Sequence, residues 1–310
     1  MKINLANIKK ARNLLNKREC VAIPTETVYG IAGNAYSDTA CKKIFKLKKR
    51  PKKNPLIVHY YDLKRLESDC NLNGDFLKLY KKFCPGPITF ILNLKKTTKI
   101  SRVATNQKNT LAVRFPKHPV TRNLLKMLKF PVAAPSANIS TRVSAVTSKD
   151  VREDFGNKIK YILEGGKSSI GIESTIIDLR NKPKILRLGG LELKFIKKIL
   201  KKKLSININP SKISAPGQFK IHYSPGIPIR LNVKKIKDNE AYLLIKKKKI
   251  TKANYYFLSK KGDLKEAAKN LYTTLRKIKK NKHKSIAVGK IPNKGFGKTI
   301  NDRLTRASKF

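Results

Sequence analysis

The fold is indicated most clearly by VAIPTETVYG, residues 21–30. The apolar run at its start stops at Pro24, as a strand that enters a loop does. Two threonine hydroxyls and a carboxylate follow, and Gly30 allows the backbone to turn tightly. Because open α/β sheets bind ligands at the carboxyl ends of their strands, this loop either holds a small polar ligand or is an ordinary capped turn.

Helical and strand-like segments alternate on both sides of this loop. Apolar residues recur at helical spacing between Leu5 and Leu15 and again between Thr39 and Lys49, where Pro51 would end the helix. The strand-like runs are PLIVHYY (55–61), PGPITFILNL (85–94), TLAVRFP (110–116), PVAAPSAN (131–138) and ESTIIDL (173–179). This alternation predicts layered α/β packing in one domain, residues 1–204.

The character of the sequence changes after this domain. Residues 205–226 are rich in Ser, Pro, Asn and Gly and lack sustained periodicity, which is typical of a linker. Beyond it, short apolar runs alternate with two helical stretches, about 263–279 and 298–306. We therefore predict a second, smaller α/β domain over residues 227–310.

The composition excludes several classes of protein. Of the 310 residues, 40% are apolar, which is enough for a substantial core and argues against disorder. No apolar run approaches the roughly 18–20 residues that span a bilayer, so we expect a soluble, cytoplasmic protein without membrane contact. The four cysteines lack paired spacing, and the four histidines show no HExxH pattern. Neither set predicts a metal site, and the cysteines are expected to be reduced structural thiols.

The net charge of +53 suggests nucleic acid, but its distribution is uniform. The chain has 57 lysines and only 15 arginines, and the lysines occur in nearly every segment. Arginine is the better residue for bidentate recognition of phosphate. The favoured explanation is a set of solvated lysine-rich faces, with weak RNA contact as the alternative.

A cationic frame is predicted for KLKKRPKKNPL, residues 46–56. Lys48 and Arg50 stand at the end of the predicted helix, where cations also gain from the helix dipole. Pro51 and Pro55 restrict the backbone on either side of Asn54. Such a rigid frame suits phosphate, because each hydrogen bond from a charged donor contributes roughly 1.5–3 kcal/mol.

Two more segments place polar groups in or after strands. Arg114 interrupts the apolar run TLAVRFP, which is costly unless a carboxylate pairs with it. The chain has only 19 acidic residues, so we favour an external carboxylate over a buried one as the partner. The small polar side chains of AAPSANISTRVSA, residues 133–145, either bind nucleotide phosphate or ribose or form an ordinary Ser-rich loop.

GFGKT, residues 295–299, is not expected to be a phosphate-binding loop, because Pro292 replaces the required first glycine.

Together these segments resemble the YrdC-like threonylcarbamoyl-AMP synthase family. The matching motifs, in the same order and spacing, are PTETVYG, a KxRP helix end with NPLIVH, PGPITFIL, TLAVRFP, APSAN and IESTIIDL. The later segments SAPGQFKIHYSP and NDRLTRAS are similar to the longer, two-domain form of that family. The resemblance covers nearly the whole chain. It implies a twisted, mixed, open sheet with flanking helices of the YrdC/RibB type and a Rossmann-like C-terminal α/β domain.

The resemblance implies a nucleotidyltransferase that joins L-threonine, bicarbonate or CO2, and ATP with its Mg2+ into threonylcarbamoyl-AMP and releases pyrophosphate. The product would pass to tRNA-modification proteins that make threonylcarbamoyladenosine. Threonine contacts are implied for Thr27, His59, Arg114, Ala134 and Ser174. ATP contacts are implied for Arg50, Asn54, Thr110, Ser136, Asn138, Ser144, Arg187 and Tyr223. Lys48 and Arg50 are implied as the catalytic cations, no protein-bound metal is implied, and no motif nominates a general base, for which Glu26 is the one candidate.

The resemblance also implies a lid. The linker of two-domain relatives folds over the active site, so Tyr223 and the HYSP segment are expected to keep water from a labile adenylate. One position departs from the pattern, because many relatives carry a Ser-Gly pair where this chain has Ser140 and Thr141. That substitution leaves the backbone geometry of the loop open.

Two other functions are compatible with parts of the sequence. An RNA-binding module of the same fold would bind RNA in a salt-sensitive manner without consuming ATP. Carbamoyl transfer of the hydrogenase-maturation kind uses the same domain, but that assembly normally carries Cys-rich zinc modules, which this sequence lacks. Turnover of ATP with and without threonine separates the enzyme from the RNA-binding module.

Overall fold

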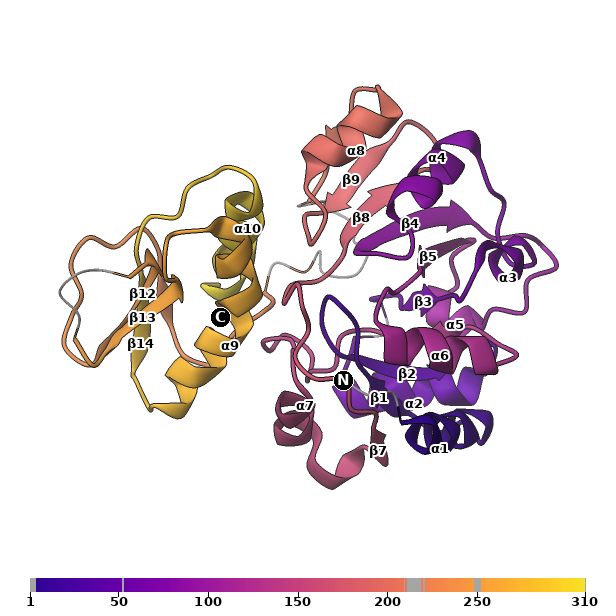
Figure 1. The fold of residues 1–310 in the computed structure, drawn as a ribbon, viewed down its shortest axis with the longest axis horizontal. Coiled ribbons are helices and arrows are strands. Elements are labelled where there is room, and N and C mark those ends of the chain that lie inside the picture. Colours follow the sequence, from indigo (N-terminus) through magenta and orange to yellow (C-terminus); the bar gives the residue numbers. More distant parts are fainter. Residues whose placement is uncertain are drawn as a thin grey trace.

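The computed structural model describes residues 4–51, 53–208, 210, 219, 221–247 and 252–309. The described chain forms one sheet of ten strands and one of four, each packed against helices (Figure 1). The predicted fold class, a large mixed α/β unit followed by a smaller one, is therefore confirmed. Much of the segment predicted as the linker lies outside the described residues.

The large unit begins with α1 (Leu5–Asn16), whose apolar face buries Ile8, Ala11 and Leu15. Its other elements are β1 (Val21–Ile23), β2 (Gly30–Asn34), α2 (Asp38–Lys48), β3 (Ile57–His59), α3 (Leu63–Glu67), α4 (Gly74–Phe83), β4 (Ile88–Asn93), α5 (Arg102–Thr105), β5 (Thr110–Arg114), α6 (Pro119–Met127), β6 (Val132–Ala133), α7 (Ser148–Phe155), β7 (Tyr161–Ile162), β8 (Thr175–Asp178), β9 (Lys184–Arg187), α8 (Leu193–Leu200) and β10 (Ser205–Ile206).

The ten strands are arranged in the order β10-β9-β8-β4-β5-β3-β6-β2-β1-β7. The sheet contains parallel pairs such as β3 with β5 and antiparallel pairs such as β4 with β5, so it is mixed, as expected. Ser205 and Ile206 pair with β9 at one edge. The sheet therefore extends two residues into the segment predicted as the linker.

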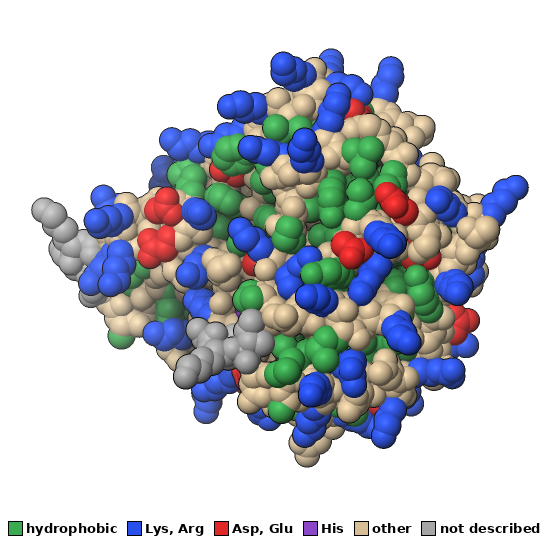
Figure 2. Space-filling view, turned by 45° about the vertical axis from the view of Figure 1, so that its right-hand side comes forward, with side chains coloured by type: hydrophobic (Ala, Val, Ile, Leu, Met, Phe, Trp, Pro, Cys, Tyr) green, Lys and Arg blue, Asp and Glu red, His purple; other side chains and the backbone are tan. Residues whose placement is uncertain are grey.

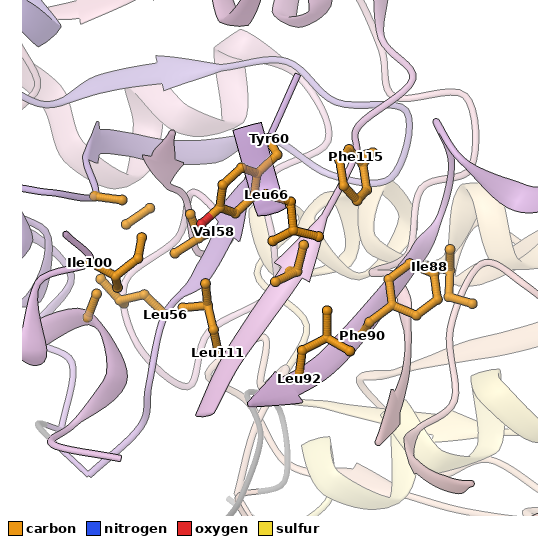
Figure 3. Close-up of a cluster of buried hydrophobic side chains, with 14 of the residues drawn as sticks. Leu56, Val58, Tyr60, Leu66, Ile88, Phe90, Leu92, Ile100, Leu111 and Phe115 are labelled. Carbon is orange, nitrogen blue, oxygen red and sulfur yellow. The ribbon is translucent and has the colours of Figure 1, made fainter. Parts of the chain in front are cut away.

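The two faces of this sheet differ. Successive side chains of a strand point to opposite faces, and Val58, Phe90, Leu111 and Val113 join the main hydrophobic core (Figure 3). The alternate positions carry a small separate apolar cluster, which consists of Ile57, Ile91, Ala112, Ile176 and Leu186. At β6 the same second face is covered by α1 and α6, because Val132, which lies opposite His59, packs with their apolar residues.

The small unit has four parallel strands in the order β11-β14-β12-β13. Its elements are β11 (Ile229–Arg230), β12 (Glu240–Lys246), β13 (Tyr255–Ser259), α9 (Leu264–Lys280), β14 (Ser285–Val288) and α10 (Phe296–Ala307). Helices α9 and α10 stand between the small sheet and the large unit (Figure 1). No helix in the described part of the chain is both long and apolar enough to cross a bilayer.

The glycines of GFGKT have structural roles at the start of α10. Gly295 precedes the helix with a φ of +48°, a conformation that favours glycine. A side chain on Gly297 would place its Cβ 1.9 Å from the carbonyl oxygen of Pro292. These glycines therefore shape a tight turn before α10.

Candidate active site

The polar residues singled out in the sequence lie along the second face of the large sheet. In the parallel pair of β3 and β5, Ile57 lies opposite Ala112 and His59 lies opposite Arg114. His59 and Arg114 therefore stand together at the carboxyl ends of the strands, beyond the apolar cluster. Thr110 has the same facing on β5 but lies at its other end, about 13 Å away at the rise of a strand.

A cavity of about 40 Å3 lies over this face. Eight of the fourteen predicted site residues line it, namely Arg50, His59, Arg114, Ala134, Ser136, Ser174, Arg187 and Tyr223. Five more are one hydrogen bond from a lining residue: Thr27 from Thr25, Lys48 and Asn138 from Ser136, Asn54 from Arg50, and Ser144 from Glu173. Thr110 is outside the lining, at the far end of β5.

The partner of Arg114 corrects one expectation. We expected an external carboxylate, but the Nη2 of Arg114 donates to Glu26 Oε1 at 2.7 Å, and both side chains are buried. The other oxygen of Glu26 accepts the backbone N–H of Lys117 at 2.9 Å. Glu26 thus neutralises and orients Arg114, and this engagement argues against a role as general base.

Several buried polar atoms around the cavity have no hydrogen-bond partner among the described residues. They are both ring nitrogens of His59, Nε of Arg114, Oδ1 of Asn54 and the hydroxyl of Tyr223. Burial, together with the neighbouring Arg114, holds the pKa of His59 well below its usual range, so the ring is neutral at pH 7. Because buried polar groups are nearly always paired, these atoms indicate where a polar ligand binds.

Two buried cations, Arg50 and Arg187, lie near each other in the lining of the cavity. Arg50 donates from Nε to Asn54 O at 2.9 Å and from Nη2 to Pro55 O at 2.8 Å, which fixes its guanidinium. Arg187 donates to the carbonyl and to the hydroxyl of Ser174, each at 3.0 Å. Burial and the nearby Arg187 lower the pKa of Arg50 to about 9. An anionic ligand would relieve this crowding of positive charge.

Lys48 supports the loop after β6. Its Nζ donates to the carbonyl oxygens of Ser136 and Asn138, and its own carbonyl accepts the N–H of Ser140 at 2.8 Å. Within the loop, Ser136 Oγ donates to Asn138 Oδ1 at 2.6 Å. Burial, and then Arg50, hold the pKa of Lys48 well below its usual range. The shape of the loop therefore depends on a lysine that the sequence assigned to phosphate.

The PTETVYG loop was interpreted either as a ligand-binding loop or as an ordinary capped turn, and it has features of both. Thr25 Oγ1 accepts the N–H groups of Thr27 and Val28, each at 3.2 Å, which closes a turn. Thr25 also lines the cavity. Gly30 does not have a positive φ, contrary to the tight turn we expected. Its missing side chain instead lets the Ala134–Pro135 segment approach, because a Cβ there would lie 3.3 Å from atoms of both residues.

The substitution at Thr141 has a structural consequence. Thr141 has a φ of +71°, in the left-handed region that glycine adopts freely and β-branched residues avoid. Its carbonyl accepts the N–H of Ser224 at 2.9 Å, and the N–H of Val143 donates to Ser224 O at 3.2 Å. The loop therefore keeps the glycine-type geometry and uses it to hold the linker.

Sequence reasoning missed three residues beside the cavity: Glu173, Tyr272 and Arg303. Glu173 lines the cavity, and Tyr272 and Arg303 of the small unit donate hydrogen bonds to Glu173. Burial raises the pKa of Glu173, but the charges of Arg303 and Arg187 outweigh this effect and lower it to about 2. Glu173 directly precedes Ser174, and Arg303 lies in the quoted NDRLTRAS motif. Both residues therefore stand in recognised motifs, but the sequence offered no reason to assign them a role.

On the face shown in Figure 2, the basic side chains are not concentrated at one site. Figure 2 shows Lys and Arg distributed over the whole visible face, with few acidic side chains between them. Among the described residues, no group of three or more His, Cys, Asp or Glu side chains could hold a metal ion. The four cysteines are free thiols, as expected.

These features define a class of protein: a two-unit α/β protein in which the buried cations Arg50, Arg114 and Arg187 line one cavity beside the large sheet. The chain belongs to the YrdC-like threonylcarbamoyl-AMP synthase family. The family model described as "Telomere recombination" matches residues 13–189, and the one described as "Threonylcarbamoyl-AMP synthase, C-terminal domain" matches residues 191–309.

Similar proteins cover almost the entire chain. The threonylcarbamoyl-AMP synthase of Pyrococcus abyssi is 35% identical over 98% of this chain and 94% of its own length. That of Bacillus subtilis is 34% identical with the same coverage of both chains. The crystal structure of P. abyssi Sua5 complexed with L-threonine superposes with a TM-score of 0.91 at 32% identity, over 100% of this chain and 96% of that one.

Proposed function

We propose that this protein synthesises threonylcarbamoyl-AMP from L-threonine, bicarbonate or CO2, and ATP, and releases pyrophosphate. The observation that carries the proposal is the presence of two unlike groups of residues in one cavity. Arg114 stands beside neutral His59, Arg50 lies near Arg187, and Lys48 is one hydrogen bond from the lining. The named relatives are synthases of this product, and the relative with bound L-threonine has the same fold.

The group with Arg114 suits the amino acid. Arg114 keeps an unused Nε donor beside its bond to Glu26, and this donor can bind the threonine carboxylate. The neutral ring of His59 has two free nitrogens for the threonine amine or hydroxyl. We assign Thr27, Ala134 and Ser174 to the same subsite, with Thr27 acting next to Thr25.

The group with Arg50 and Arg187 suits the triphosphate. Arg50 and Arg187 are held by carbonyl groups, so they present fixed charges to phosphate oxygens at little cost in ordering. Lys48 acts mainly by shaping the loop of Ser136. We assign the nucleotide to Arg50, Asn54, Thr110, Ser136, Asn138, Ser144, Arg187 and Tyr223. ATP would bring its own Mg2+, which would neutralise part of the phosphate charge.

The reaction then proceeds by positioning and charge stabilisation. The threonine amine attacks the carbon of CO2 and loses a proton to solvent, which gives a carbamate. A carbamate oxygen attacks the α-phosphorus of ATP, the bond to the bridging oxygen breaks, and pyrophosphate leaves with the electron pair. Arg50 and Arg187 stabilise the developing negative charge, and the shared cavity holds both reactants in attacking distance.

The end of the linker is proposed to act as a lid. Tyr223 is 1% exposed and His222 is 9% exposed, and both line the cavity. A volume of about 40 Å3 is far below the roughly 300–1,000 Å3 of a small-molecule site, so the lining must rearrange to admit ATP, and we assign this movement to residues 222–223. Their return would exclude water from the adenylate.

We further place this reaction in the cytoplasm, with the product passing to proteins that modify tRNA. The alternative, an RNA-binding module without catalysis, rests on the charge of +53 alone. A weak RNA contact is compatible with the enzyme, because the spread of lysines favours non-specific attraction to phosphate.

The test is pyrophosphate release with and without threonine in the presence of bicarbonate and ATP. We expect release that requires threonine, and we expect Arg50→Ala and Arg114→Ala to lower it by about a hundredfold or more. Arg152→Ala is the matched control, since Arg152 is exposed and distant from the cavity lining. No threonine-dependent release from the folded wild type, or full activity in both variants, would contradict the proposal.

A further inference from the structure

A buried polar cluster at the boundary between the domains is not used by the reaction described above. Its centre is Glu173, which is 5% exposed and lies two residues before β8. Ser144 donates to Glu173 at 2.6 Å from the same domain. Tyr272 of α9 donates at 2.8 Å and Arg303 of α10 at 3.1 Å from the C-terminal domain. One cavity-lining carboxylate is therefore held by both domains.

Arg303 is itself fixed on every side. It is 1% exposed, and its Nη2 donates to the carbonyl of Leu188 in the large domain at 2.6 Å. Its Nη1 donates to Asp302, while its Nε is the atom bound to Glu173. Because the guanidinium is planar and uses three of its nitrogens in different directions, its orientation sets that of the Glu173 carboxylate.

The same C-terminal residues hold the linker tyrosine. The ring of Tyr223 stacks on Tyr272 with centroids 5.8 Å apart and an interplanar angle of 17°. The Arg303 guanidinium lies 4.7 Å from the centroid of the Tyr223 ring. Tyr223 has a φ of +64°, which is unfavourable for a bulky residue and persists only where the surroundings impose it.

The large domain holds the other side of the segment that contains Tyr223. The contacts are the two backbone hydrogen bonds between Ser224 and the Thr141–Val143 loop. Removing the C-terminal contacts would leave Tyr223 attached on one side only. The hydroxyl of Tyr223, which has no partner among the described residues, would then lose its place in the cavity lining.

We infer that Arg303 is a positioning residue for the nucleotide half of the site. It orients Glu173, and through it the hydroxyl of Ser144, and it holds Tyr223 across the cavity. The nucleotide subsite is therefore built from both domains, whereas neither His59 nor Arg114 has a hydrogen bond to this cluster among the described residues. The inference rests on the function proposed above, because it assumes that Ser144 and Tyr223 face ATP.

The first experiment compares the wild type with Arg303→Gln. Dissociation constants for ATP and for threonine are measured separately by calorimetry, alongside kcat and KM. We expect the ATP dissociation constant and KM to rise about tenfold, as the loss of a hydrogen bond from a charged donor predicts. We expect the threonine constant to change less than twofold. A residue with only a structural role would reduce the folded fraction and leave both constants of the folded protein unchanged.

A second variant covers the case in which Arg303→Gln does not fold. Tyr272→Phe removes only the hydroxyl that donates to Glu173 and keeps the ring under Tyr223. We expect it to fold and to weaken ATP binding about threefold, without affecting threonine. The matched control is Lys280→Ala, which removes an exposed ion pair between the same two domains, to Glu153, away from Tyr223. This control should bind both ligands as the wild type does.

The outcomes separate the inference from the proposed function. Unchanged ATP binding in folded Arg303→Gln, or in Tyr272→Phe if the former does not fold, overturns the inference alone. An equal loss of ATP and threonine affinity in these variants also overturns it. A wild-type protein that binds no ATP overturns both the inference and the proposed function.

Discussion

Glu26 and Arg114 form a buried ion pair, with 2.7 Å between Oε1 and Nη2, at the carboxyl end of the central strands. The pair joins the PTETVYG loop to β5, and these were two separate motifs in the sequence. It leaves Nε of Arg114 without a partner among the described residues. The arginine is therefore held and neutralised by one carboxylate and still has a donor for a second, that of the substrate.

Breaking this pair should destabilise the fold. Glu26→Ala leaves the Arg114 guanidinium buried without its counter-charge, which typically costs about 3–5 kcal/mol. Urea unfolding should show a loss of that order in the free energy of unfolding. The control is Glu164→Ala, whose partner Arg152 is 3.9 Å away and exposed, and which should change stability by less than about 1 kcal/mol. Similar losses in the two variants would contradict the assignment.

Relief of backbone strain is expected at Thr141. Thr141→Gly places glycine where φ is +71° and should raise the free energy of unfolding by about 1 kcal/mol. Thr141→Ala keeps a Cβ at the same φ and should gain less. The two variants are compared by thermal and urea unfolding. If Ala stabilised the protein as much as Gly, the positive φ would not be the source of the strain.

Lys48 and its neighbour Lys46 should respond differently to the same substitution. Lys48→Met removes the donor of two buried carbonyls, those of Ser136 and Asn138, which predicts a loss of about 1–3 kcal/mol in stability and a higher KM for ATP. Lys46 is exposed on the same helix, so Lys46→Met should change neither. A normal stability with impaired turnover in Lys48→Met would instead indicate that its ammonium contacts phosphate directly.

The pH dependence of stability should report on Glu173. Its pKa is about 2 in the folded protein and near 4.5 without these contacts, so its contribution is complete above pH 5 and is lost as the pH falls toward 2. Between pH 5 and pH 2 the free energy of unfolding of the wild type should fall by about 3 kcal/mol more than that of Glu173→Gln, because each unit of pKa shift corresponds to about 1.36 kcal/mol. Unfolding free energies measured at several pH values would test this, and parallel curves for the two proteins would contradict it.

Much of this site could be predicted from local patterns. Arg50, His59, Arg114 and Ser136 each follow or end a strand or helix, and the alternation of elements brought them to one face of one sheet. What the sequence could not reveal were long-range partners. Glu26 is 88 residues from Arg114, and Arg303 is 130 residues from Glu173, so no spacing rule connects them.

Some details depended on backbone geometry that residue types do not determine. Thr141 adopts a conformation normal for glycine because Ser224 and the loop around it require it. Ser205 and Ile206 look like part of a linker by composition, yet the free edge of β9 pairs with them. In each case tertiary contacts overrode the local preference.

The most direct test of the central claim is mass spectrometry of the nucleotide formed from L-threonine, isotopically labelled bicarbonate and ATP. The account predicts threonylcarbamoyl-AMP that carries the label, in equal amount to the pyrophosphate released, and none when Arg114→Ala replaces the wild type. Formation of only AMP or ADP, or no change in ATP while the folded protein binds RNA tightly, would contradict it.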